Sequence, residues 1–418
     1  MADKKRIYLC LAHMSEAGLE QKYIKEAFDT NWVVPLGPNV NGFEKDLEEF
    51  CGQNKRIVAL SAGTAAVHLA LIACGVKAGD EVCVQSFTFC ASSHPITYLG
   101  ATPIFIDSEK DTWNMDPDLL EEAIKDRIAK TGRKPKAIVP VALYGMPYNV
   151  DRIMEIANRY DIPVIEDAAE GFGSRWKGQV LGTFGKYGVL SFNGNKMITT
   201  SGGGALVTNN EDEWREIMMY ATQYRESYPY YQHEKIGFNY HMSNICAGIG
   251  RGQMTVANDH IAHHKHVQKM YEELLADVPG VHVHAQPATG EYDSNYWLCT
   301  ITIDENVKIK GQENAYKTIV TGAVGGAAGV IHAASSAVTD CQPNDNVEAL
   351  RVFMDAAGIE ARPLWKPMHK QPCYKDAPAY LNGVSEAMFK VGMCLPAGPY
   401  VSEEDVKYIV ETIKASIC

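Results

Sequence analysis

Four features that could do chemistry each follow a strand-like apolar run in the first half of the chain. The turn 61–64, "SAGT", opens a helical pattern, and Phe89 follows a second apolar run. Asp167 ends a third run, and Lys196 follows a fourth, after two asparagines and before a pair of threonines. In open α/β sheets, ligands bind beyond the carboxyl ends of the strands. We therefore expect the turn, the aromatic ring, the carboxylate and the ammonium group to face one ligand.

Together these four features meet the requirements of pyridoxal phosphate. A lysine forms a Schiff base with its aldehyde, and a carboxylate keeps its pyridinium nitrogen protonated, so that the ring can accept electrons. The N–H groups and hydroxyls of the turn could hold its phosphate, and an aromatic ring could lie against its ring. Alone, Ser61, Thr64 or Asp167 could be a helix cap. Phe89 alone could be a core residue, and Lys196 a solvated loop residue.

The elements that must position these residues follow an α/β pattern. Short apolar strands alternate with helices between residues 56 and 210, which predicts a mostly parallel sheet covered by helices on both faces. The expected strands are 56–60, 81–85, 103–106, 137–143, 163–166, 188–192 and 205–208, and the expected helices are 64–75, 116–130, 150–160 and 211–223.

A smaller α+β region follows a long helical pattern at 243–277. Its expected strands lie near 281–284 and 296–303, and its expected helices near 346–357 and 402–416. We therefore divide the chain into a large α/β domain, 1–255, and a smaller C-terminal α+β domain, 256–418.

The composition narrows the class of protein. The chain has 418 residues, a formal net charge of −12 and no basic stripe with interleaved aromatic residues, which disfavours nucleic-acid binding. Its 11 cysteines are scattered, without a C-x-x-C pair, which indicates reduced thiols in the cytoplasm. His13 interrupts the N-terminal apolar run, so we expect no signal peptide. The uncharged stretch 319–338 is rich in Gly, Ala and Ser, and we expect no membrane span there.

Two further motifs favour no additional ligand. The segment 259–266, "DHIAHHKH", places three histidines on one helical face, but a solvated face explains them better than a metal, and we expect no metal. The triple glycine 202–204 does not fit the G-x-G-x-x-G pattern of a dinucleotide site. We expect these glycines to let the backbone pass close to the site without side-chain clashes.

Seven motifs, spread over nearly the whole chain, resemble those of the DegT/StrS-type sugar aminotransferases. They are "SAGTAAVHLAL", "SFTFCASSHPITYLGATPIFID", "ALYG", "VIEDAAEGFGS", "SFNGNKMITTSGGGAL", "GFNYHMSNICAGIG" and "ARPLWKPMHKQP". The resemblance implies a fold-type-I (aspartate aminotransferase-like) pyridoxal phosphate enzyme, with a mixed, mostly parallel sheet in a large domain and a smaller α+β domain. Within the family, "RPLWKPMH" and "YLNGVSE" most resemble the 4-aminotransferases of the UDP-N-acetylbacillosamine pathway.

The resemblance also implies roles for matching positions. Lys196 would form the covalent aldimine with the cofactor and Asp167 would pair with its pyridinium nitrogen, so these two are the expected catalytic residues. The other expected cofactor-binding residues are Ala62, Gly63, Thr64 and Ser191 at the phosphate, Phe89 on the ring, Glu170 near the ring oxygen, and Asn239 reaching the phosphate from a neighbouring subunit. The expected sugar-nucleotide contacts are Asn31, Trp32, His241, Trp365, Lys366 and His369.

The implied reaction moves an amino group in two half-reactions. L-glutamate would give its amine to the cofactor, and a UDP-linked 4-keto-6-deoxy-N-acetylhexosamine would then take it. The freed amine of Lys196 would carry the proton between substrate and cofactor. The product would be a UDP-4-amino-4,6-dideoxy sugar for bacterial glycan biosynthesis, made by a homodimer with shared active sites.

Three alternatives stand beside this reaction. An aminotransferase for another nucleotide-linked keto sugar, with the ketone at carbon 3 or a different nucleotide, fits the same motifs, because a fold does not fix a substrate. A non-catalytic sensor or regulator could also use this fold. A pyridoxamine-dependent sugar dehydratase is disfavoured, because that class has a histidine where this chain has Lys196.

The sequence departs from the family at three places. Ala142 stands before "LYG", where relatives usually have His. His241 stands where relatives usually have an Arg, which in some of them meets the substrate's phosphates; a neutral His donates one hydrogen bond in place of a fork. The region 304–350 matches poorly and is enlarged, which indicates an altered lid or a decoration.

Overall fold

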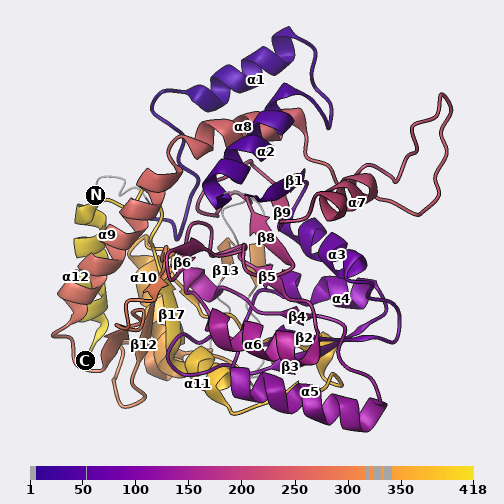
Figure 1. Cartoon of the computed structure of the whole chain (residues 1–418). Helices are drawn as coiled ribbons and strands as arrows, with labels where there is room; N and C mark the ends of the chain where they lie inside the picture. The colour runs from indigo at the N-terminus through magenta and orange to yellow at the C-terminus, as the bar shows by residue number, and fades with distance from the viewer. Residues whose placement is uncertain (1–5, 53, 317–320, 324–330, 334–340) are drawn as a thin grey trace.

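The computed structural model describes residues 6–52, 54–316, 321–323, 331–333 and 341–418 (Figure 1). A large mixed sheet lies between two layers of helices, and a smaller sheet backed by helices of the C-terminal part lies beside it (Figure 1). The predicted α/β fold class is therefore confirmed.

The central sheet is mostly parallel. Its two four-stranded halves have the orders β1-β9-β8-β5 and β4-β2-β3-β16. Parallel bridges from Ile138 to Val164 and from Val141 to Asp167 join the halves at β4 and β5. Within the described part of this sheet, β9 alone runs against its neighbours. The strands are β1 (Arg56–Leu60), β2 (Glu81–Gln85), β3 (Thr102–Ile106), β4 (Ile138–Val139), β5 (Ile165–Asp167), β8 (Tyr187–Ser191), β9 (Gly204–Thr208) and β16 (Ala379–Tyr380).

Alternate residues of the central strands enter two hydrophobic cores, one on each face of the sheet. In β1, Ile57 and Ala59 belong to the core that includes residues of α2, α5, α6 and α8, whereas Val58 and Leu60 belong to the core that includes residues of α3, α4 and α7. Because both faces are covered, these strands are mostly apolar, as predicted. The helices are α2 (Pro38–Cys51), α3 (Gly63–Ala73), α4 (His94–Tyr98), α5 (Pro117–Thr131), α6 (Val150–Tyr160), α7 (Glu211–Ala221) and α8 (Asn244–Met254), with α1 (Leu19–Asp29) packed on α8.

The smaller sheet is antiparallel, with the order β10-β12-β17-β15. Its strands are β10 (Val281–Val283), β12 (Cys299–Ile303), β15 (Arg362–Pro363) and β17 (Gly392–Leu395). Helices α9 (Ala257–Leu275), α10 (Asp345–Ala356) and α12 (Glu403–Ser416) build a third core with this sheet. The remaining elements are short: β6 (Arg175–Trp176), β7 (Gln179–Val180), β11 (Tyr292–Asp293) and α11 (Val384–Val391).

Two predicted elements are wrong in extent, and four helices were not predicted. The helix expected at 243–277 is divided into α8 and α9 at Thr255 and Val256, where Val256 has non-helical dihedral angles and the Thr255 hydroxyl donates to Gly252 O at 2.6 Å. The strand expected at 137–143 ends at Val139, because Pro140 has no N–H for the ladder. Helices α1, α2, α4 and α11 occupy residues for which the sequence indicated no element.

The enlarged region 304–350 lies partly outside the described residues, and so does most of the uncharged stretch 319–338. Two short strands of this region, β13 (Thr321–Ala323) and β14 (Ile331–Ala333), pair antiparallel. In the part of the chain that the structure describes, no helix is long and apolar enough to cross a membrane.

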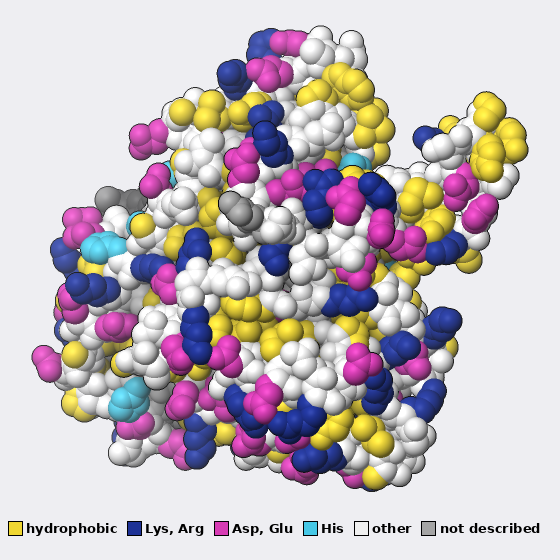
Figure 2. Space-filling model, in the orientation of Figure 1, with side chains coloured by type: hydrophobic (Ala, Val, Ile, Leu, Met, Phe, Trp, Pro, Cys, Tyr) yellow, Lys and Arg dark blue, Asp and Glu magenta, His cyan; other side chains and the backbone are white. Residues whose placement is uncertain are grey.

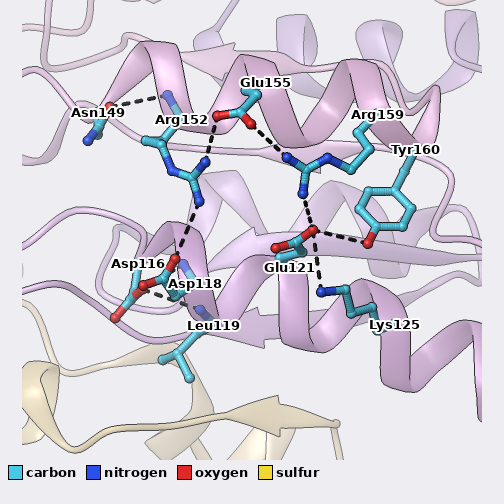
Figure 3. Close-up of polar contacts among 10 residues, drawn as sticks. All are labelled: Asp116, Asp118, Leu119, Glu121, Lys125, Asn149, Arg152, Glu155, Arg159 and Tyr160. Carbon is cyan, nitrogen blue, oxygen red and sulfur yellow. Dashed lines mark hydrogen bonds and ion pairs between the residues drawn. The ribbon is translucent and has the colours of Figure 1, made fainter.

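An ion-pair network links the outer surfaces of α5 and α6 (Figure 3). Arg152 pairs with Glu155 at 2.5 Å and with Asp118 at 3.5 Å, and Arg159 pairs with Glu155 at 2.6 Å and with Glu121. Desolvation raises the pKa of Glu121, but hydrogen bonding led by Arg159 lowers it more. Since exposed pairs stabilise little individually, the network mainly fixes how the two helices lie against each other.

A long arm, residues 223–239, projects from the body beyond α7 (Figure 1). Its two sides are held together by bridges between Thr222 and Asn239 and between Arg225 and His233. The arm carries exposed large hydrophobic side chains, which are Tyr228, Tyr230, Tyr231 and Ile236. Figure 2 shows an apolar patch at its outer end.

Candidate active site

The four predicted features meet in one cavity of about 300 Å³, at the carboxyl ends of β1, β2, β5 and β8. Of the predicted site residues, the cavity brings together Ala62, Gly63, Thr64, Phe89, Asp167, Glu170, Ser191, Lys196 and Trp365. Parallel strands with neighbouring carboxyl ends explain this convergence, since each residue follows or ends a strand or begins the next helix.

Lys196 reaches the cavity from the loop after β8. Its Nζ lies 3.7 Å from Glu170 Oε1 and 3.9 Å from the centre of the Trp297 ring. The side chain is only 12% exposed. The amine therefore has a carboxylate on one side and an aromatic face on the other, in a position to react with a bound carbonyl group and to move protons.

Asp167 is buried and held by two donors. Ser92 Oγ donates to Asp167 Oδ2 at 2.6 Å, and the Ala169 N–H donates to Oδ1 at 3.1 Å. Burial raises the pKa of Asp167, whereas these hydrogen bonds and the charge of Lys196 lower it. A buried carboxylate of this kind favours a cationic partner, such as a protonated ring nitrogen.

Glu170 is fixed by the backbone of a strained residue. The N–H of Tyr144, whose φ is +53°, donates to Glu170 Oε2 at 2.7 Å. Burial raises the pKa of Glu170, and the nearby charge of Lys196 is the largest opposing effect. The Tyr144 hydroxyl accepts a hydrogen bond from the backbone N–H of Trp365 at 2.8 Å, which connects Glu170 to the segment after β15, an edge strand of the smaller sheet.

The start of α3 is prepared for an anion. Ala62 is the N-cap, and among the described residues no side chain caps this helix, which leaves its first N–H groups for a ligand. A Cβ on Gly203 would lie 2.1 Å from Thr200 Oγ1, and one on Gly204 would lie 2.4 Å from Gly63 N. Glycine at position 204 therefore lets β9 pass directly against the start of α3, as predicted, and glycine at position 203 leaves room for Thr200, whereas a Cβ on Gly202 would meet nothing within 4 Å.

Aromatic side chains form the wall next to Phe89. The Phe89 side chain is 51% exposed, although it lines the cavity, so a ring face is available to a ligand. Its ring centre lies 5.7 Å from that of Trp365. A hydrogen bond from the Trp365 side chain is among the effects that lower the pKa of Glu170, so the indole N–H is directed at that carboxylate.

Six predicted contacts lie outside the cavity lining. Asn239 is exposed at the base of the arm, where Gln223 Nε2 donates to its Oδ1 at 3.1 Å. His241 Nδ1 lies 2.8 Å from Pro35 O and its Nε2 lies 3.4 Å from Glu44 Oε1, so both ring nitrogens have partners within the chain. The other four are Asn31, Trp32, Lys366 and His369.

His369 in particular is occupied by structural contacts. Its Nδ1 lies 2.7 Å from Ser86 Oγ, its Nε2 lies 3.1 Å from Glu386 Oε1, and its side chain is buried. A substrate would have to replace one of these partners to bond the ring.

Several lining residues escaped the sequence prediction. Trp297, from the segment before β12, faces Lys196, although about 100 residues separate them in the chain. Ser92 donates a hydrogen bond to Asp167. Asn193 and Asn195 precede Lys196 in its loop and line the cavity. The motif "SFTFCASS" contains Ser92 and could have indicated it, because a hydroxyl after a strand end lies near the site; no local pattern marks Trp297.

The donors present fit pyridoxal phosphate. An uncapped helix start suits a phosphate, a buried carboxylate suits the ring nitrogen, a half-exposed aromatic face suits the ring, and a buried lysine suits the aldehyde. In the described ranges, no group of three or more His, Cys, Asp or Glu is arranged to hold a metal.

The fold and the cavity define a fold-type-I pyridoxal phosphate enzyme. The structure is similar to that of a DegT DnrJ EryC1 StrS aminotransferase from Brucella abortus, with a TM-score of 0.81 and 27% identity, over 96% of this chain and 95% of that one. The model of the DegT/DnrJ/EryC1/StrS aminotransferase family matches residues 15–325 and 312–414. The chain belongs to this family and is a pyridoxal phosphate-dependent sugar aminotransferase.

Two relatives are similar over nearly their whole length. EpsN of Bacillus subtilis (strain 168), named as a pyridoxal phosphate-dependent aminotransferase, is 42% identical over 413 residues, covering 98% of this chain and 95% of EpsN. GDP-perosamine synthase of Escherichia coli O157:H7 is 33% identical over 408 residues, covering 97% of this chain and 98% of the synthase.

Proposed function

We propose that this enzyme acts in the cytoplasm as a homodimer and moves an amino group from L-glutamate to the 4-keto group of UDP-4-keto-6-deoxy-N-acetylhexosamine. The product is a UDP-4-amino-4,6-dideoxy sugar for glycan biosynthesis. The observation that carries the chemistry is the placement of Lys196 Nζ, Asp167 and the start of α3 around one cavity. The motifs "RPLWKPMH" and "YLNGVSE" support the acceptor by their resemblance to UDP-sugar 4-aminotransferases.

The binding residues each hold one part of the cofactor. When bound, pyridoxal phosphate supplies an electron sink and an aldehyde that combines with amines. Gly63 and Thr64 would donate backbone N–H groups to the phosphate, and Ser191, buried beside Gly63, would add a hydroxyl. Asp167 would hold a proton on the ring nitrogen through its carboxylate, and Phe89 would cover a ring face.

Lys196 Nζ is the group that moves the proton. Its amine would take the proton from the α-carbon of L-glutamate, and in the second half-reaction it would deliver a proton to the former carbonyl carbon of the acceptor sugar. Glu170 Oε1, 3.7 Å away, orients the amine between these transfers. The low exposure of the lysine side chain keeps water from competing for the same proton.

The acceptor sugar lies toward the outer side of the cavity. Trp365 lines the cavity beside Phe89, so its ring can lie against the sugar. We assign Asn31, Trp32, His241, Lys366 and His369 to the entrance and to the subunit interface, where a sugar nucleotide would pass.

A different nucleotide sugar is the second candidate acceptor. The 33% identity to GDP-perosamine synthase over nearly the whole chain favours this alternative, because that relative is named for a GDP-linked product. A sugar with its ketone at carbon 3 could use the same site, because Lys196 would transfer the proton in the same way whichever sugar carbon carries the amine.

An acceptor comparison separates these candidates. The enzyme is first loaded with pyridoxal phosphate and treated with L-glutamate until its visible absorbance is lost, and the excess L-glutamate is then removed. The enzyme is then given UDP-4-keto-6-deoxy-N-acetylglucosamine, a GDP-linked 4-keto-6-deoxy sugar or a UDP-linked 3-keto sugar. We expect the first sugar to restore the visible absorbance with a kcat/KM at least about tenfold above the others, and an amino sugar of matching mass. A higher kcat/KM for another acceptor would establish the second candidate, and bleaching without any active acceptor would contradict both.

The homodimer proposal rests on the arm and on the open cavity. Asn239 stands at the base of an arm that projects away from its own subunit (Figure 1). The arm carries four exposed large hydrophobic side chains, and the α1–α2 segment adds more; these are Phe28, Trp32, Val33, Val34 and Leu36. Such surfaces indicate a buried interface, and a second subunit would bring its Asn239 to the phosphate.

Mixing inactive variants tests the shared site. Lys196→Ala lacks the amine in every site, and Asn239→Asp places a negative charge beside every phosphate. If each site combines Lys196 of one subunit with Asn239 of the other, refolding the two variants together restores about one quarter of the wild-type sites. Activity no higher than that of the two variants measured separately would contradict the proposal.

A further inference from the structure

Trp297 occupies a position that the family motifs did not indicate. It comes from the segment before β12, yet its ring lines the cavity, with its centre 3.9 Å from Lys196 Nζ. The side chain is 1% exposed. A cation over an indole face, shielded from water, is attracted by the ring quadrupole, and this attraction is strongest for tryptophan.

The indole is also tied to the backbone beside the lysine. Trp297 Nε1 donates to Asn195 O at 2.7 Å, and Asn195 immediately precedes Lys196. One side chain therefore contacts both ends of the lysine: the amine through the ring face, and the preceding carbonyl through the N–H.

Asn295 fixes Trp297 relative to the carboxylate on the other side of the amine. Asn295 Oδ1 accepts a hydrogen bond from the backbone N–H of Trp297 at 2.8 Å. Its Nδ2 donates to the backbone carbonyls of Glu170 and Phe172, both at 2.9 Å. The ring face and the Glu170 carboxylate thus belong to one hydrogen-bonded frame, with the lysine amine between them.

We propose that Trp297 is a positioning residue for Lys196: its ring face holds the free amine beside Glu170, and its N–H fixes the loop that carries the lysine. This inference rests on the proposed role of Lys196 in proton transfer. When the amine is free of the cofactor, the frame keeps it at the cavity wall, ready for the next transfer. Without the frame, the flexible lysine side chain samples other rotamers and the transfer slows.

The test compares three changes at Trp297 with one matched control. Trp297→Leu removes the ring face and the N–H, Trp297→Phe keeps a ring face only, and a tetrafluorinated tryptophan at position 297 keeps shape and N–H but weakens the quadrupole. Trp176→Phe is the control, because Trp176 is also buried and donates its N–H, to Asp151 at 2.9 Å, but lies outside the cavity lining.

Two measurements are made on these proteins. The first is the single-turnover rate with L-glutamate and with α-deuterated L-glutamate, together with the half-saturating glutamate concentration. The second is made on cofactor-free protein: the rate at which acetic anhydride labels Lys196, followed by peptide mass spectrometry and compared with labelling of exposed lysines.

We expect Trp297→Leu to lower the single-turnover rate at least about fivefold, to leave half-saturation within about threefold, and to raise the deuterium isotope effect. Lys196 labelling should accelerate at least about threefold in Trp297→Leu and in the fluorinated protein, and less in Trp297→Phe. Trp176→Phe should change neither measurement.

The inference would be overturned if Trp297→Leu lowered the single-turnover rate by less than about fivefold, or if Trp176→Phe lowered it as much as Trp297→Leu does. If Trp297→Leu fails to fold, the fluorinated protein decides, because its shape is unchanged: unaltered labelling and turnover would overturn the role of the ring face. Failure of the proposed function is distinguishable, because Lys196→Ala would then retain turnover whatever happens at Trp297.

Discussion

Replacing Lys196 with alanine is expected to reduce turnover with L-glutamate and keto sugar by at least about 10⁴-fold, because it removes both the covalent attachment and the proton carrier. The visible absorbance of the lysine-bound cofactor should also disappear. The measurement is steady-state amino-sugar formation together with an absorbance spectrum of the purified protein.

Lys196→Arg is the matched control for charge. It keeps a cation near Glu170 and over the Trp297 ring, but a guanidinium neither forms the covalent bond nor releases a proton near neutral pH. We expect it to be as inactive as Lys196→Ala. Its free energy of unfolding should be higher than that of Lys196→Ala, because the buried carboxylates of Asp167 and Glu170 keep a positively charged neighbour. Turnover of either variant above about 1% of wild type would contradict the assigned role of Lys196.

Asp167→Asn is expected to lower kcat about 10²–10³-fold while leaving the fold intact, because a neutral amide cannot hold the ring nitrogen in its protonated form. Asparagine has nearly the same shape as aspartate, and its oxygen can still accept the hydrogen bonds from Ser92 or Ala169. Single-turnover kinetics with L-glutamate should show the loss in the chemical step, with little change in half-saturation.

Glu166→Gln provides the comparison within the same strand. Glu166 is as buried as Asp167, but its carboxylate accepts the N–H groups of Gly182, Phe184 and Gly185, at 2.9, 2.5 and 2.6 Å, away from the cavity. We expect this variant to lose stability rather than kcat, seen as a lower melting temperature with near-normal turnover. Equal losses of kcat at the two positions would show that Asp167 acts through the fold and not through the cofactor.

The sequence predicted the part of the site that depends on parallel strands. The central strands are mostly apolar, because helices cover both faces, and the polar residues at or after the strand ends mark the same sheet edge. This is why Lys196, Asp167, Phe89 and the turn before α3 could be grouped before the structure was known.

What the sequence did not predict depends on contacts between distant segments. Trp297 meets Lys196 because the segment before β12 folds back onto the large sheet, and no local pattern carries that information. The occupied ring nitrogens of His241 and His369 likewise depend on Pro35, Glu44, Ser86 and Glu386, which lie far away in the chain. Motif resemblance gives residue types at a site, but their hydrogen-bond partners follow only from the packed structure.

The break between α8 and α9 shows a similar limit. The helical pattern continues through Thr255 and Val256, and both residues are tolerated in helices, so nothing local ends the helix. The chain turns there because α8 packs with α1 and α2, whereas α9 runs to the third core beside the smaller sheet.

The most direct test of the central claim is to find where the cofactor attaches. The purified enzyme is loaded with pyridoxal phosphate, reduced with borohydride and digested, and the modified peptide is sequenced by mass spectrometry. The proposed site predicts one phosphopyridoxyl group, on Lys196, and its loss when L-glutamate is added before the reductant. Stoichiometric attachment to any other lysine, or none in a folded protein, would contradict the site proposed around Lys196, Asp167 and the start of α3.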